Sequence, residues 1–124
     1  MFGFFHNPQR EARGLHRDAR VIIDDATHTY REQLLNEIAG QIQTDLLHIE
    51  TNTRSGAGSR KRELERHTSL HREARRKFNP VALTAHTLVI IHLRASALGE
   101  AGQKTLGMID EFIRTWSKTD LDEH

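Results

Sequence analysis

Residues 80–98, PVALTAHTLVIIHLRASAL, are apolar around most of a helical circumference, unlike any other part of this 124-residue chain. Asn79 and Pro80 form a helix-start signal, and Gly99 is the residue type that commonly ends a helix in the left-handed conformation. A helix that is apolar on all sides has to be enclosed by other elements. The segment therefore predicts a helical bundle with residues 80–98 at its centre.

Four other segments carry a single apolar stripe each, at the spacing of a helix. We therefore expect an all-α protein with one domain, residues 1–124, in which four long helices and an N-terminal helix pack as a helical bundle with antiparallel neighbours. The four striped helices are expected at residues 8–25, 29–51, 59–77 and 103–118, with tails at 1–6 and 119–124 and a flexible, glycine-rich loop at 52–59.

Between residues 22 and 46 an apolar residue recurs at every fourth position. On an ideal helix each step of four turns the stripe by about 40°, so a straight helix could not keep it against one partner. The chain therefore either breaks here or forms one long, bent helix that serves two partners. The capping-box pattern Thr29-x-x-Glu32 favours a break near residues 25–29.

Hydrophobic residues in two further places are expected to complete the core. The narrow seam of the third helix consists of Leu64, His67, His71, Ala74 and Phe78, with Leu70 at its edge. Three phenylalanines near the start, Phe2, Phe4 and Phe5, are expected to fold back and close one end of the bundle, or else to dock on a partner.

Nine histidines make a metal site the sharpest chemical hypothesis for this chain. His67 and His71 are four residues apart, so they share one helical face, and both lie on the seam that faces the bundle interior. Two imidazoles alone make a weak site. Two more pairs on the second helix, His28-x-x-x-Glu32 and Asp45-x-x-His48, could add imidazoles and carboxylates, which together suit Fe, Zn or Mn. The expected metal ligands are His67, His71, His28, Glu32 and His48.

The spacings His28-x-x-x-Glu32 and His67-x-x-x-His71, within a small helical bundle, resemble part of the hemerythrin pattern. The His-x-x-x-x-Asp element of that family is missing after both histidines of residues 80–98. The resemblance implies a metal-binding bundle, hemerythrin-like or with another set of histidines and carboxylates.

Four polar residues fall where the pattern predicts burial: His86, His92, Asp45 and Arg94. The two histidines, about 120° apart on the central helix, are expected to be neutral with depressed pKa values and not to share a metal. A buried acid needs a cation nearby, and Arg94 is the expected partner of Asp45.

The third helix is strongly basic. Residues 54–77 contain nine Lys and Arg against three Glu, a balance of +6, whereas the whole chain has a net charge of +1. Such asymmetry favours an acidic protein or a nucleic acid as partner, although charges spread around a helix are also typical of a solvated face. The candidate partner-binding residues are Arg60, Lys61, Arg62, Arg66, Arg72, Arg75 and Arg76.

The chain contains no cysteine, which excludes disulfides, thiolate metal sites and cysteine nucleophiles. The loop at 52–59 lacks the Walker spacing, and no nucleophile elbow occurs, so an enzyme is disfavoured. No apolar run has the roughly 20 residues of a membrane span. We therefore expect a cytoplasmic protein without a membrane span.

These features favour a small intracellular helical bundle that acts as an interaction or regulatory module through protein contacts. A homodimer is expected, because the central helix has more apolar surface than its single-striped neighbours need. The alternatives are a metal-binding bundle and nucleic-acid binding through the basic helix, residues 59–77.

Overall fold

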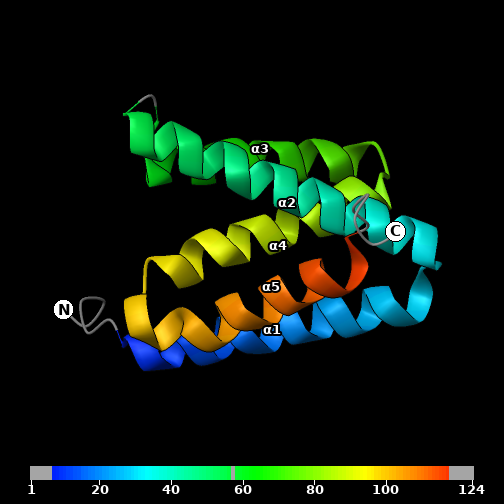
Figure 1. The fold of residues 1–124 in the computed structure, drawn as a ribbon, viewed down its shortest axis with the longest axis horizontal. Helices are drawn as coiled ribbons and strands as arrows, with labels where there is room; N and C mark the ends of the chain where they lie inside the picture. Colours follow the sequence, from blue (N-terminus) through cyan, green and yellow to red (C-terminus); the bar gives the residue numbers. More distant parts are fainter. Residues whose placement is uncertain (1–6, 57, 118–124) are drawn as a thin grey trace, which may run out of the picture.

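Five α-helices and one 3-10 turn build the fold in the computed structural model, which describes residues 7–56 and 58–117 (Figure 1). These described residues contain no strand, so the all-α prediction is confirmed. None of the described helices combines the length and the apolar character needed to cross a membrane. Phe2, Phe4, Phe5 and the two expected tails lie outside the described residues. The elements are α1 (Pro8–Thr29), α2 (Glu32–Ser55), α3 (Arg60–Arg76), α4 (Pro80–Ser96), η2 (Gly99–Gly102) and α5 (Gln103–Trp116).

Helix α4 lies at the centre of the bundle, as its apolar circumference predicts. Figure 1 shows it between α2 and α3 on one side and α1 and α5 on the other, and all four helices contact it. Ala85, Leu88 and Val89 of α4 are fully buried. The expected cap is present, because the Asn79 side chain accepts a hydrogen bond of 3.1 Å from the backbone N–H of Ala82.

The end of α4 depends on two glycines. Gly99 adopts a φ of 63°, the left-handed conformation that the sequence predicts at this position. A Cβ atom at Gly102 would lie 2.0 Å from the carbonyl oxygen of Ala95, so only glycine lets η2 approach α4 this closely. The short connection brings α5 back along the bundle, where it contacts α1, α2 and α4.

The chain breaks between α1 and α2 and does not form one long bent helix. The break lies at Tyr30 and Arg31, which are extended, and therefore a few residues after the expected position at 25–29. Thr29 still belongs to α1 and Arg31 caps α2 without a side-chain hydrogen bond, so the expected Thr29–Glu32 capping box is wrong. Because the chain breaks here, the apolar residues of α1 and those of α2 do not have to form one stripe on one straight helix, and each set can pack separately.

Two expectations about α2 and α3 are corrected. Helix α2 continues through Ser55 and ends at Gly56, whose φ is 82°, so the connection to α3 is shorter than the expected loop at 52–59. Ser59, a residue type that commonly begins a helix, caps α3, because its side chain accepts a hydrogen bond of 3.1 Å from the backbone N–H of Arg62. Phe78, expected on the seam of α3, is 89% exposed, because α3 ends at Arg76 and Phe78 adopts a left-handed φ of 54° in the turn before α4.

Candidate metal centre

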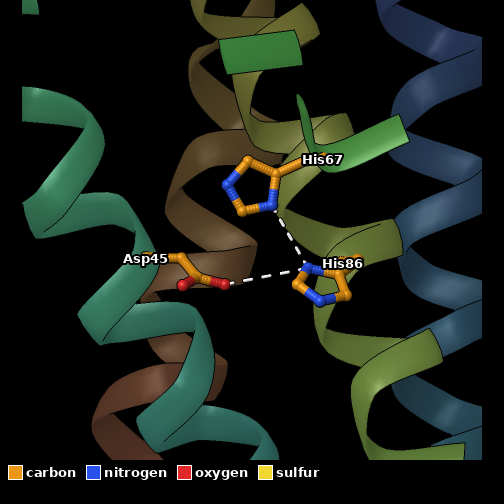
Figure 2. Close-up of side chains that lie close together, drawn as sticks. All are labelled: Asp45, His67 and His86. Carbon is orange, nitrogen blue, oxygen red and sulfur yellow. Dashed lines mark hydrogen bonds and ion pairs between the residues drawn. The ribbon is translucent and has the colours of Figure 1, made fainter. Parts of the chain in front are cut away.

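Three helices bring one carboxylate and two imidazoles together inside the bundle. Asp45 comes from α2, His67 from α3 and His86 from α4 (Figure 2). His67 Nδ1 lies 3.2 Å from His86 Nδ1, which in turn lies 3.8 Å from Asp45 Oδ2. The three potential ligand atoms all lie within 4.8 Å of one another. No other group of three or more such residues occurs in the described parts of the chain.

The cluster is shielded from water. His67 and His86 are buried, and the Asp45 side chain is only 13% exposed. Burial lowers the pKa of His67 and of His86 below the ordinary value, although the Asp45 carboxylate acts to raise both. Both imidazoles are therefore neutral at pH 7, which is the form of histidine that binds metals.

The hydrogen bonds around the cluster determine which ring nitrogens carry protons. Arg66 Nη2 lies 3.3 Å from His67 Nε2, and a guanidinium can only donate, so this nitrogen accepts. The single proton of neutral His67 is then on Nδ1, which donates to Nδ1 of His86. His86 Nδ1 consequently has no proton of its own and carries its proton on Nε2.

This arrangement leaves an oxygen without a donor. Asp45 Oδ1 accepts from Gln41 Nε2 at 3.0 Å, but the buried Oδ2 has no hydrogen-bond partner among the described residues. Oδ2 faces the unprotonated Nδ1 of His86 at 3.8 Å. Two electron-rich atoms that face each other in a dry interior form a place for a cation.

The distances fit a first-row metal ion. A metal about 2.1 Å from each ligand places the ligand atoms about 3.0 Å apart at octahedral angles and about 3.4 Å apart at tetrahedral angles. The observed separations of 3.2 and 3.8 Å are close to these values, and the third pair, His67 and Asp45, lies within 4.8 Å, so a shift of Asp45 toward both imidazoles would complete the site. Two imidazoles and one carboxylate form a ligand set typical of Zn²⁺ and of non-haem Fe²⁺, with coordination positions left open.

Of the five expected metal ligands, only His67 belongs to this cluster. His71 is half-buried one turn further along α3 and lines a groove next to α1. His28 and Glu32 are both exposed on opposite sides of the helix break, and His48 is exposed on α2. The partners of His67 are instead Asp45, which the pair Asp45-x-x-His48 offers as a possible ligand, and His86, which was expected to be buried but not to contact His67.

The expected pair of Asp45 and Arg94 is wrong. Arg94 is exposed and lines the groove next to α1, whereas Asp45 faces His86. His92 does not share the site of His86, as expected, and its Nε2 lies 3.8 Å from Asp110 Oδ1. Burial lowers the pKa of His92, although Asp110 acts to raise it.

All seven candidate partner-binding residues of the basic helix are exposed. Two of them form ion pairs on their own helix, Arg66 with Glu63 at 3.2 Å and Arg76 with Glu73 at 2.6 Å. Nucleic-acid binding through these residues stays a prediction.

Fold and site together define an all-α five-helix bundle with a buried cluster of two histidines and an aspartate. Comparison of the chain with protein-family models, with curated proteins and with solved structures finds no match. The break between α1 and α2 also falls between His28 and Glu32, so the His28-x-x-x-Glu32 spacing of the hemerythrin resemblance does not lie on one helix. Function therefore has to be argued from the cluster itself.

Proposed function

We propose that this protein is a metal-binding helical bundle in which Asp45, His67 and His86 hold one Zn²⁺ or Fe²⁺ ion. The observation that carries the proposal is the buried Oδ2 of Asp45, which has no donor among the described residues and faces the lone pair of His86 Nδ1. A bound cation satisfies both atoms at once, and His67 supplies the third ligand from a neighbouring helix.

The position of the cluster indicates what a metal ion would do. Its three ligands lie on three different helices, so binding would tie α3 to both α2 and α4. An ion that binds the folded chain more tightly than the unfolded chain stabilises the fold. The proposed role is therefore a metal-dependent stabilisation of the bundle, and the open coordination positions would leave room for a further ligand.

Elemental analysis of untagged protein purified without chelator, followed by zinc titration against a chromophoric chelator, tests the proposal. We expect one tight site in the wild type, and its loss in His67→Ala and Asp45→Asn. His48→Ala is the matched control, because His48 is exposed on the same helix as Asp45 and lies outside the cluster. Equal zinc binding by all four proteins, or the absence of a tight site in the wild type, would overturn the proposal.

The second candidate function is self-association as an interaction module. A groove of about 450 Å³ runs along α4 between α1 and α3, lined in part by Leu15, Ile22 and Ile90. Val21 at its edge is an apolar residue that is 60% exposed. The groove also carries charges of both signs, including Asp18 and Arg94, which would allow opposite charges to pair across a contact between two identical copies.

Self-association would cover this groove with the same groove of a second copy. Light scattering at high micromolar concentration should then give a dimer for the wild type and a monomer for Val21→Glu. A strict monomer for the wild type would rule this function out and leave the metal site unaffected.

A further inference from the structure

The residue next to the proposed site holds His67 in a form that cannot bind a metal through Nδ1. Arg66 donates to His67 Nε2 over 3.3 Å, which places the imidazole proton on Nδ1. A metal ion in the cluster needs the lone pair of that same Nδ1, since this atom lies 3.2 Å from His86 Nδ1 and points into the cluster (Figure 2). The present contact of Arg66 and the proposed metal ion therefore exclude each other.

The Arg66 side chain can move away from His67 if its ion pair with Glu63 breaks. This side chain is 45% exposed, so the guanidinium can be hydrated once it turns away from the imidazole. What holds it beside His67 is Glu63, whose Oε1 accepts from Arg66 Nε at 3.3 Å and from Nη2 at 3.2 Å. The Glu63 side chain itself is only 6% exposed and is fixed by Asn52 on α2, 3.3 Å away.

Glu63 also provides the acceptor that a metal-bound His67 needs. It precedes His67 by one helical turn on the same face of α3, and both residues are buried. Metal-binding histidines commonly donate their other ring N–H to a carboxylate. After Arg66 leaves, the imidazole still has one proton, which has moved from Nδ1 to Nε2. His67 Nε2 and Glu63 Oε1 both contact Arg66 Nη2, at 3.3 and 3.2 Å, so a small shift of the Glu63 carboxylate would let it accept this proton.

We infer that Arg66 is a gate for the metal site: while it contacts His67 the site is closed, and metal binding requires its displacement. This inference rests on the proposed function, since it concerns the same three ligands. It assigns Arg66 and Glu63 the roles of positioning residues that act through the tautomer of His67.

Zinc titration of Arg66→Gln and Arg66→Met against the wild type tests the gate. Met has no donor, and the Gln amide is shorter and uncharged, so Arg66→Met should bind zinc about tenfold more tightly and Arg66→Gln should lie between it and the wild type; tenfold is the lower end of the range by which partners of metal-binding histidines change metal affinity. Arg62→Gln is the matched control, because it removes the same charge from an exposed position one turn away on α3. Its zinc affinity should stay within about twofold of the wild type.

The tautomer can be read directly from the metal-free protein by 15N NMR of its histidine side chains at pH 7.5. We expect the proton of His67 on Nδ1 in the wild type and a shift toward Nε2 in Arg66→Met, which has no donor at this position. A wild-type proton on Nε2, or equal zinc affinities of Arg66→Met, Arg62→Gln and the wild type, would overturn the gate while leaving the metal site intact. If neither the wild type nor the Arg66 variants bind zinc, the proposed function falls and the gate falls with it.

Discussion

Acidification should destabilise this bundle through its buried histidines. His67, His86 and His92 have pKa values lowered by burial in the folded chain, whereas the unfolded chain has the ordinary value near 6.5. The folded state therefore binds fewer protons than the unfolded state below pH 6.5. The stability that depends on neutral histidines is present above this value and is lost as the pH falls through it toward the folded pKa values.

The largest possible loss follows from the same pKa values. When the pH falls from 7.5 to 5.5, a histidine that stays neutral in the folded chain lowers the free energy of unfolding by about 1.4 kcal/mol, because the same histidine becomes protonated in the unfolded chain. Three such residues give an upper limit of about 4 kcal/mol, a large part of the stability of a typical domain. Asp45 and Asp110 oppose the burial effect, so the actual loss lies below this limit.

Urea unfolding in the presence of a chelator measures this loss without interference from metal ions. Trp116, the single tryptophan, is half-buried against the core and reports unfolding by fluorescence. His92→Gln should reduce the difference between the two pH values by at most about 1.4 kcal/mol and leave the contribution of the cluster. Equal free energies of unfolding of the wild type at pH 7.5 and 5.5 would refute the argument that burial keeps these imidazoles neutral.

Four further perturbations should change the free energy of unfolding: three should raise it and one should lower it. Zinc at one hundred times its dissociation constant should stabilise the wild type by about 2.7 kcal/mol and leave Asp45→Asn unchanged in thermal melts. Gly102→Ala should lower the free energy of unfolding measured in urea by about 1–3 kcal/mol, because the new Cβ would collide with Ala95. Gly107→Ala should raise it by about 0.5–1 kcal/mol, because Gly107 lies inside α5 with open space around its Cβ position. Phe78→Gly should stabilise by about 1 kcal/mol in the same assay, since it relieves a left-handed backbone at an exposed position; a loss of stability would instead reveal a contact of the Phe78 ring.

Periodicity and caps were sufficient to predict most of the fold. The all-round apolar character of residues 80–98 identified the central helix, and Asn7, Ser59 and Asn79 cap their helices as their residue types predict. The errors lie at helix ends, where local signals compete. Thr29 and Glu32 have the spacing of a capping box, but Thr29 remains helical, and Phe78 has the spacing of a seam residue but follows the end of its helix.

The candidate site was harder to predict, because its three ligands lie on three helices and no spacing within one helix links them. Of the expected partners of His67, only His71 follows from spacing within one helix. His28, Glu32 and His48 belong to other segments, and periodicity places only residues of one helix relative to one another. The useful signals were instead single polar residues at positions where the pattern calls for an apolar one. They are Asp45 in the apolar stripe of α2, His67 on the seam of α3 and His86 in the apolar helix α4. Buried without a polar partner, each of these residues would have a desolvation cost. The packing of α2, α3 and α4 against one another brings the three residues together. Polar residues that break the apolar pattern of adjacent helices should therefore be paired with one another before any partner is sought along the same helix.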